Sequence, residues 1–490
     1  MTDQTNSEIV QQRLANLQYL RDKGYEPFGR AFRRTGQLAE IRAAFEENKV
    51  VAVAGRVMTL RDMGKSIFAD LRDGTDRFQV YAQKNHLGEE AFDAFKKLDI
   101  GDLIGVEGPL FTTRTGEKSV KLDRWTLLSK ALLPLPEKWH GLKDVDQRYR
   151  QRYLDLIANP PTREVFDKRI RMVREIRAYL HDRGFQEVET PMMQPLAGGA
   201  AARPFVTHYT ALDSRMYLRI APELYLKRLL VGGFDKIFEL NRNFRNEGLD
   251  RTHNPEFTMM EIYEAYSDVR GMKELVEGLI VHVAQSVLGT LKVGTTEAPI
   301  DLTPPWREVT YKDLILEKAG ADWYSLDKDA MRAKAEALGL YAAPEWTPLE
   351  ITHEIYEKTI ERTLQNPTFV TRLPAELVPL AKRCEDDPTL VDVFELVIGG
   401  KEIAPGYSEL IDPIEQRKRF DLQAAAAASP RATGEEQKMD EDFVTALEHG
   451  MPPAGGMGVG IDRLVMMLLG CEAIRDVILF PQLKPKEEPV

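Results

Sequence analysis

Between Val50 and Leu128, apolar and polar positions alternate in short runs separated by turn-forming residues, and this period of two predicts a β-barrel. The expected strands are VVAVAGRVMTL, SIFADLRD, RFQVYAQ, DLIGVEGPLFTT and SVKLDRWTLL. One helix is expected near Glu89 to Lys97, between the third strand and the fourth. This is the layout of an OB-fold, which commonly binds single-stranded nucleic acid, although other small barrels share the pattern.

Helical periodicity replaces this alternation on both sides of the barrel. Residues 7–22 predict an amphipathic helix that ends before Gly24. A second helix is expected from Thr162 to Leu180, with an apolar stripe of Phe166, Ile170, Val173, Ile176 and Leu180. The arginines and lysines of residues 138–183 then point away from the core, and we expect most of them to serve structure and subunit contacts.

A charged β-hairpin is expected at residues 238–263, where two apolar runs flank a turn rich in Asn, Gly and Asp at residues 246–254. The hairpin can bring Arg245, Glu247 and His253 to one ligand. Arginine is always charged and has a planar fork of donors, so this group suits the phosphates of a nucleotide. A solvated charged hairpin without a ligand is the alternative.

A glycine-rich stretch, GGMGVGIDRLVMMLLG at residues 455–470, places Gly456, Gly458 and Gly460 just ahead of Asp462, Arg463 and a short apolar helix. It is not a dinucleotide fingerprint because Ile461 stands at the third glycine, and the chain contains no G-x-x-x-x-G-K-[ST] loop. We expect these glycines to let the backbone approach a flat ligand closely. A further segment, RGFQEVETPMM at residues 183–193, predicts a strand after a helix stop.

In this order, the last three segments resemble motifs 1, 2 and 3 of the class II aminoacyl-tRNA synthetases. The shared features are a basic-Gly-Phe strand ending in Thr-Pro, F-R-x-E with H-x-x-x-F downstream, and G-x-G-x-[DE]-R. Four longer segments are similar, more closely, to class II lysyl-tRNA synthetases. They are GGAAARPF, RIAPELYLKRLLVGGFDKIFELNRNFRNEG, HNPEFTMMEIY and ALEHGMPPAGGMGVGIDR. With the N-terminal region included, the resemblance covers essentially the whole chain.

The resemblance implies an α+β chain of two domains. An N-terminal helix and an OB-fold barrel that binds the anticodon of tRNA(Lys) would occupy residues 1–140, followed by a Pro-rich linker at 132–144. The catalytic domain, 141–490, would contain an antiparallel sheet flanked by helices and a helical insertion near 311–364. The motif 1 strand, from Gln186 to Thr190, would build a homodimer interface together with the basic helix before it.

The resemblance also assigns contacts to tRNA and ATP. In the barrel, Phe68 matches a base-stacking position and Gln79 a base-edge position, with Arg56 and Glu117 expected beside them; the alternative places Phe68 in the barrel core. The expected ATP contacts are Arg245 to the α-phosphate and substrate carboxylate, Arg463 to the γ-phosphate, Phe257 to adenine, and His253 and Glu247 to the rest of the nucleotide.

Carboxylates dominate the remaining matched positions. Glu395 and Glu402, in FELVIGGKE, match magnesium-binding residues. Selection of lysine requires carboxylates around its ammonium, because a buried unpaired charge is costly. The matched residues are Glu223 for the α-amine, Glu261, Tyr263 and Glu409 for the side-chain amine, and Tyr407 in the same pocket. Aspartyl- and asparaginyl-tRNA synthetases need cationic or amide groups there.

One position departs from the family pattern. Pro405 stands where the family often has asparagine, which puts one substrate contact in doubt. Ser408 is not expected to act as a nucleophile, because GYSEL lacks the second glycine of a nucleophile elbow and a nearby histidine partner.

Composition limits the alternatives without choosing among them. The chain has 490 residues and a net charge of −11, which argues against wholesale nucleic-acid binding but not against a local contact surface. Only Cys384 and Cys471 are present, and no apolar run is long enough for a membrane span, so we expect a cytoplasmic protein. A ligase that lysylates a protein and a catalytically inactive RNA-binding paralogue remain the alternatives.

Overall fold

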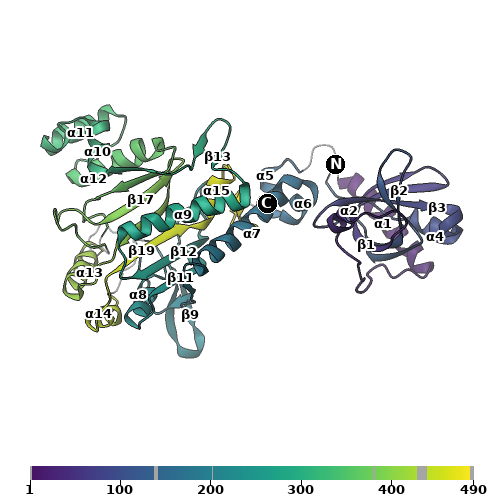
Figure 1. The fold of residues 1–490 in the computed structure, drawn as a ribbon, viewed down its shortest axis with the longest axis horizontal. Coiled ribbons are helices and arrows are strands. Elements are labelled where there is room, and N and C mark those ends of the chain that lie inside the picture. The colour runs from purple at the N-terminus through teal and green to yellow at the C-terminus, as the bar shows by residue number, and fades with distance from the viewer. Residues whose placement is uncertain (1–2, 137–141, 201, 379–380, 428–438, 486–490) are drawn as a thin grey trace. The chain divides into compact units, whose positions relative to one another are not determined.

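The computed structural model describes residues 3–136, 142–200, 202–378, 381–427 and 439–485. It contains two compact units, Met1–Lys143 and Asp144–Val490 (Figure 1). The boundary expected near residue 140, and the central part of the linker expected at 132–144, lie outside the described residues. No helix in the described ranges is long and apolar enough to cross a membrane.

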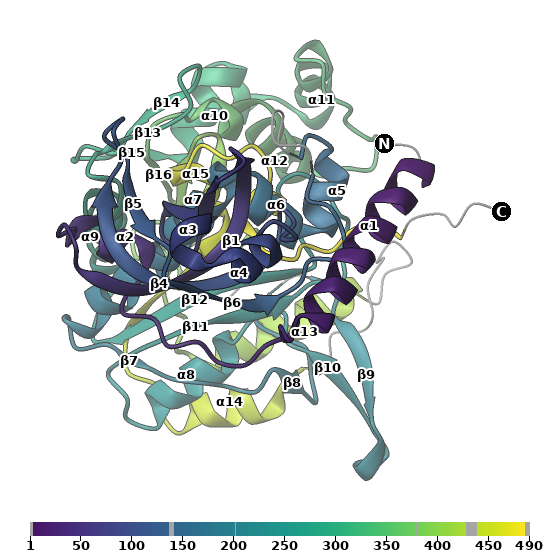
Figure 2. The same ribbon diagram turned by 90° about the vertical axis from the view of Figure 1, so that its right-hand side faces the viewer.

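The first unit is a six-stranded barrel in the order β1-β2-β3-β5-β4-β6, closed by pairing of β1 with β4 (Figure 2). Inward positions of its strands, such as Phe78, Val80 and Ile104, are fully buried, as the period of two predicted. The OB-fold is therefore confirmed. Its strands are β1 (Val50–Asp62), β2 (Ser66–Arg72), β3 (Arg77–Gln83), β4 (Leu103–Thr112), β5 (Lys118–Lys121) and β6 (Arg124–Ser129).

The expected fifth strand is in fact two strands. β5 pairs with both β3 and β4 and ends at Lys121. The next strand, β6, pairs with β4. The N-terminal helix is held against the barrel by Arg13, whose guanidinium donates to the carbonyls of Ile100, Ala131 and Leu133. The helices of the unit are α1 (Asp3–Asp22), α2 (Leu38–Ala43), α3 (Lys84–Leu87) and α4 (Glu89–Phe95).

An eight-stranded sheet forms the centre of the second unit, in the order β15-β16-β17-β18-β19-β12-β11-β7. All neighbouring pairs are antiparallel except β15–β16 and β11–β7, so the expected α+β class is confirmed. The strands are β7 (Gln186–Glu187), β11 (Lys236–Phe244), β12 (Glu256–Ala265), β15 (Arg307–Thr310), β16 (Thr368–Thr371), β17 (Val393–Ile398), β18 (Lys401–Ser408) and β19 (Ala454–Gly460).

Helices pack on this sheet and share two hydrophobic clusters with its strands. Residues of α7 (Pro160–His181), α9 (Val269–Leu288) and α15 (Ile461–Leu468) share the larger cluster with the strands, and α8 (Glu223–Val231) and α14 (Glu441–Glu448) share a smaller one (Figure 1). The remaining elements outside the insertion are α5 (Val145–Arg150), α6 (Arg152–Ala158), β8 (Met193–Gln194), β9 (Phe205–Tyr209), η1 (Thr210–Leu212), β10 (Ser214–Leu218), β13 (Lys292–Gly294), β14 (Pro299–Asp301), α13 (Pro413–Ala427) and α16 (Ile474–Val477).

The segment expected as an insertion is helical and packs on one end of the sheet. Trp323, Ile351 and Tyr356 are buried in a cluster that also includes residues of β16 and β17. The last turns include a five-residue π-helix, a form frequent at functional sites. Its elements are α10 (Tyr311–Ala319), η2 (Trp323–Ser325), α11 (Lys328–Ala337), α12 (Pro348–Ile355), η3 (Tyr356–Ile360) and η4 (Glu361–Thr363).

Two local expectations were wrong. Ile170 is 63% exposed rather than part of the buried stripe of α7, because α7 packs chiefly against α9 with the face that carries Met172 and Ile176. The motif 1 strand is also shorter than expected. Only Gln186 and Glu187 pair with β11 as strand.

Candidate active site

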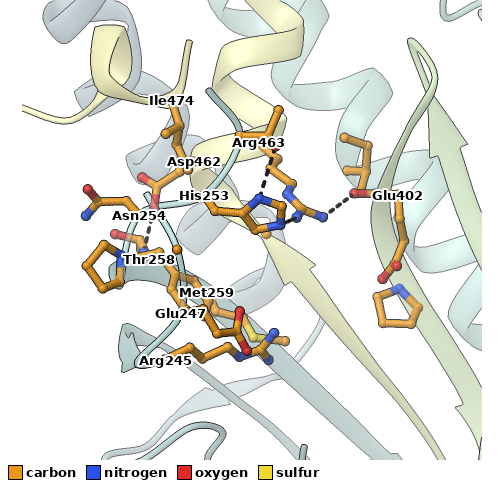
Figure 3. Close-up of a pocket in the computed structure, with 17 residues that line it drawn as sticks. Arg245, Glu247, His253, Asn254, Thr258, Met259, Glu402, Asp462, Arg463 and Ile474 are labelled. Atoms are coloured by element: carbon orange, nitrogen blue, oxygen red, sulfur yellow. Dashed lines mark hydrogen bonds between the residues drawn. The ribbon is translucent and has the colours of Figure 1, made fainter. Parts of the chain in front are cut away.

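A cavity opens where the β11–β12 hairpin, β18 and α15 meet (Figure 3). The hairpin register pairs Phe244 with Glu256, so the turn between them overhangs the cavity. The cavity has about 860 Å³ of space, part of it open to solvent. Its walls include Arg245, Glu247, His253, Phe257, Glu402, Pro405 and Arg463, which brings all the expected nucleotide residues to one place.

Arg463 lies across this cavity, fixed by two contacts (Figure 3). Its Nη1 donates to the Glu402 carbonyl at 3.2 Å, and its Nη2 lies 2.9 Å from His253 Nε2. A guanidinium can only donate, so His253 Nε2 accepts and the ring proton is on Nδ1. That nitrogen lies 2.8 Å from Asp250 Oδ2, to which it donates. These two contacts hold the Arg463 guanidinium at the cavity, where a polyanion would lie.

Arg245 adds a second cation on the opposite wall. Its backbone N–H donates to the Pro255 carbonyl at 2.8 Å, which fixes the residue at the end of β11. The guanidinium lies over the Phe257 ring, 5.1 Å from the ring centre. Its Nε is buried without a hydrogen-bond partner. A buried donor without a partner is costly, and an anionic ligand would satisfy it.

Glu395 and Glu402 come from a tight hairpin, β17–β18, whose turn is made by Gly399 and Gly400. Both glycines have positive φ, 61° and 68°, a region that disfavours other residues. Burial, and next the charge of Glu402, raise the pKa of Glu395 to about 8. Two carboxylates that repel each other in this way suit a hard divalent cation.

Residues missed in the sequence support these glutamates. The Tyr356 hydroxyl donates to Glu395 Oε2 at 3.0 Å, and Glu361 Oε1 accepts the Glu402 backbone N–H at 2.9 Å. Both supports come from the π-helical turn and the residues after it. Within the described ranges, no group of three or more His, Cys, Asp or Glu side chains could hold a metal. A magnesium ion would therefore share its coordination with phosphate oxygens and water.

The residues expected to bind lysine form a second, buried group. Glu223 begins α8, Glu261 and Tyr263 lie on β12, and Glu409 follows β18. The three glutamates are 5%, 4% and 2% exposed. The Tyr263 hydroxyl donates to Glu261 Oε2 at 3.0 Å. Tyr407 lies close enough to all three carboxylates for their charges to raise its pKa, after burial.

The glycine-rich stretch also shapes this group. Its glycines at 455–460 lie on the buried strand β19, between β18 and β12, and its apolar part forms α15. A Cβ on Gly456 would collide with Glu409 and Tyr263, and one on Gly458 with Met259. Gly456 therefore makes room for the Glu409 side chain, and the close approach of this backbone to a flat ligand stays a prediction.

A lysine of the chain lies among these carboxylates. Lys227, fully buried on α8, has its Nζ 2.7 Å from Glu223 Oε1 and 2.5 Å from Glu409 Oε2. Glu409 Oε1 is buried and has no hydrogen-bond partner. The i, i+4 spacing of Glu223 and Lys227 was visible in the sequence as a helical pair. Only the fold reveals that the same ammonium reaches Glu409.

Two neighbouring polar residues have structural contacts. Asp462 Oδ2 accepts the Thr258 N–H at 2.7 Å, and its Oδ1 lies 2.5 Å from Arg169 Nη1, so this aspartate ties α15 to β12 and α7. The Ser408 hydroxyl donates to Asp392 and accepts the Val269 N–H. Ser408 is thus held in a packing network.

On the barrel, one outward face carries three aromatic rings in sequence. The centre of the Phe68 ring lies 4.8 Å from that of Tyr81, which lies 5.6 Å from that of Phe111. Phe68 faces outward while Ile67 is 2% exposed, which removes the core alternative for Phe68. Gln79 is 9% exposed, and its Oε1 accepts from Ser119 Oγ at 2.9 Å. The same hydroxyl lies 3.3 Å from the Glu117 carbonyl.

The expected position of Arg56 beside Phe68 is wrong. A bulge in β1 between residues 57 and 59 sets the register so that Arg61 pairs with Phe68. Arg56 pairs instead with Arg72, and its Nη1 donates to the Gly101 carbonyl at 2.8 Å. Arg61 is thus the basic residue next to the aromatic face, and its proximity to Phe68 could not be counted from the sequence without the bulge.

Comparison with known proteins agrees with both units. The family described as tRNA synthetases class II (D, K and N) matches residues 144–484, and the OB-fold nucleic acid binding domain matches residues 51–128. The lysine–tRNA ligase of Carboxydothermus hydrogenoformans is 52% identical over 491 residues, covering 99% of this chain and 100% of that protein. Those of Syntrophomonas wolfei (52%, 98% of each chain) and Staphylococcus haemolyticus (47%, 99% and 100%) are similar along the same length.

Proposed function

The chain belongs to the lysine–tRNA ligases of the class II tRNA synthetases, and on this premise we propose that it activates L-lysine with ATP and transfers the lysyl group to tRNA(Lys). The observation that carries the choice of lysine is the buried group of Glu223, Glu261 and Glu409. Carboxylates in this environment favour a cationic side chain and oppose aspartate or asparagine.

In the first step, a carboxylate oxygen of lysine attacks the α-phosphorus of ATP. A new P–O bond forms, the bond to the β-phosphate bridging oxygen breaks, and pyrophosphate leaves with that electron pair. Positioning and charge neutralisation dominate such transfers. Arg245 has an unpaired buried Nε for the α-phosphate and substrate carboxylate, and Arg463 is oriented for the terminal phosphate.

Glu395 and Glu402 would hold magnesium together with the phosphates, since their paired carboxylates fit a hard cation. When bound, magnesium neutralises charge on the phosphate oxygens. Phe257 would stack on adenine by the ring face that Arg245 leaves free, and Glu247 and His253 would complete the nucleotide contacts. Tyr356 and Glu361 hold the two glutamates in place.

In the second step, a hydroxyl of the terminal ribose of tRNA attacks the carbonyl carbon of lysyl-adenylate. The ester forms and AMP leaves. The aromatic face of Phe68, Tyr81 and Phe111 is suited to stacking anticodon bases, with Gln79 and Glu117 at its edge. The OB-fold unit also favours a nucleic-acid substrate over a protein substrate.

A homodimer is part of the proposal. The motif 1 region carries exposed apolar side chains, among them Ile170 at 63%, Met193 at 54% and Val206 at 45%. Exposed apolar side chains of this kind are candidates for a contact surface, and most soluble oligomers pair through two-fold symmetry. The cytoplasmic location expected from the sequence stays a prediction.

Amino-acid-dependent exchange of pyrophosphate into ATP tests the proposed activation step. Lysine should support exchange that requires magnesium, and aspartate and asparagine should not. The Glu395→Gln variant should lose exchange, whereas Glu472→Gln, which removes a surface partner of Arg251, serves as the matched control and should keep it. Equal exchange with aspartate and lysine would contradict the assignment.

A further inference from the structure

The amino-acid pocket contains an ammonium supplied by the chain itself. We propose that Lys227 is a positioning residue for amino-acid selection, bridging Glu223 and Glu409 and setting the pocket's charge to match an amino acid with two ammonium groups. The inference rests on the proposed function of this site. It assigns Lys227 no contact with the reacting atoms.

The bridge connects two separate elements. Lys227 and Glu223 lie one turn apart on α8, and Glu409 follows the central strand β18. Distances of 2.7 and 2.5 Å from Nζ to the two carboxylates leave no room for a water between them. An ammonium has three donors and no acceptor, so it holds one oxygen of each carboxylate and leaves the second oxygen free for a ligand. In Glu409, this second oxygen, Oε1, is buried without a hydrogen-bond partner.

The charges of the pocket then fit one class of substrate. Glu223, Glu261 and Glu409 supply three carboxylates, and Lys227 supplies one ammonium. Two negative charges remain, and free lysine brings two ammonium groups, while Arg245 stands on the side of the substrate carboxylate. Norleucine would bring one ammonium, and aspartate would add a negative charge. Buried charges without partners are strongly unfavourable, so both should be rejected.

Removal of Lys227 would leave three carboxylates close together. Mutual repulsion would then favour proton uptake by one of them, which would remove the charge that attracts the substrate. Glu409 would also lose the contact that fixes its orientation. The expected defect is therefore in lysine recognition rather than in ATP binding.

The barrel offers a matched control. Lys130 is also buried, at 3% exposure, and pairs with two carboxylates, Asp99 and Asp102. It lies in the first unit, whereas the residues assigned to ATP and lysine lie in the second. Substitution of Lys130 therefore removes a similar buried bridge without touching amino-acid selection.

The test compares Lys227→Met and Lys130→Met in the full-length enzyme. Pyrophosphate exchange gives kcat/KM for lysine and norleucine, and calorimetry gives the ATP affinity. For Lys227→Met we expect kcat/KM for lysine to fall by about a hundredfold or more, chiefly through KM, because a site with unpaired buried charge rejects its ligand. The value for norleucine and the ATP affinity should change little. Lys130→Met should keep the parent's ratio of lysine to norleucine.

The Glu409→Gln background provides the second measurement. If Lys227 acts through Glu409, Lys227→Met should lower kcat/KM for lysine by less than about threefold in this background, since coupled residues are not additive. Comparing Glu409→Gln with the double variant tests whether Lys227 acts through Glu409, even where Lys227→Met alone fails to fold. A full, multiplicative loss in the Glu409→Gln background, or an unchanged ratio of lysine to norleucine in folded Lys227→Met, would overturn the proposal. Failure of the parent to use lysine would overturn the proposed function instead.

Discussion

Lysine binding should release protons from the empty pocket. Burial, opposed by Lys227, raises the pKa of Glu409 to about 7. Burial and the charge of Glu223 raise the pKa of Glu261 to about 8. At pH 7 in the free protein, Glu261 is therefore mostly protonated and Glu409 about half protonated. Two substrate ammonium groups would favour the ionised forms and expel those protons.

These two pKa values set the size of the effect. At pH 7, a group with a pKa of 7 is about half protonated and one with a pKa of 8 about nine-tenths, so binding should release about one proton. By linkage, the Kd for lysine should be about tenfold lower at pH 8 than at pH 7. The same groups act on stability in the opposite sense. Their folded pKa values lie above the unfolded ones, so the free protein loses stability as pH rises from about 4.5 to 8.

Calorimetry of lysine binding in buffers with different ionisation enthalpies measures the protons released. The parent should release about one proton at pH 7, and Glu409→Gln, which cannot titrate at this position, should release about half a proton less. A heat of binding that is independent of the buffer would rule out the expected proton release, because it would mean that both carboxyl groups are already ionised. Lysine affinity that falls as pH rises from 7 to 8 would refute it equally.

Three other outcomes follow from the contacts described above. Arg463→Ala should slow lysine-dependent pyrophosphate exchange by about a hundredfold or more, because one electrostatic contact to the transition state is typically worth roughly 3 kcal/mol, and exchange within threefold of the parent would contradict its role. Phe68→Ala should raise the KM for tRNA about fivefold or more with pyrophosphate exchange unchanged, since stacking of a base contributes about 1 to 3 kcal/mol, and Met63→Ala, at an exposed turn, is its control. Light scattering at micromolar concentration should give twice the chain mass of 55.7 kDa, and a single chain mass would rule out the homodimer.

Regular alternation made the barrel and the hairpin predictable from the sequence. In the barrel, inward residues such as Phe78 and Val80 follow a strict period of two, and the β11–β12 hairpin pairs around a turn of polar residues. The family motifs then placed the cations and carboxylates of the cavity together correctly. These features depend on neighbours in sequence, which is why they could be inferred without a structure.

Features that depend on distant partners could not be inferred in the same way. The bulge in β1 brings Arg61, instead of Leu60, opposite Phe68, while Arg56 pairs with Arg72. Ile170 satisfies the helical period, yet α7 packs against α9 with another face. The bridge from Lys227 to Glu409 joins residues far apart in the chain, and no local pattern announces it.

Charging of a defined tRNA(Lys) transcript decides directly whether this protein is a lysine–tRNA ligase. The full-length protein, ATP and magnesium are incubated with the transcript and, separately, with lysine, aspartate or asparagine, and the ester at the 3′ end is quantified. We expect lysyl-tRNA alone, because three buried carboxylates and one internal ammonium match only the dicationic amino acid. Aspartyl- or asparaginyl-tRNA as the main product, or no charging by a protein that activates lysine, would contradict the proposed function.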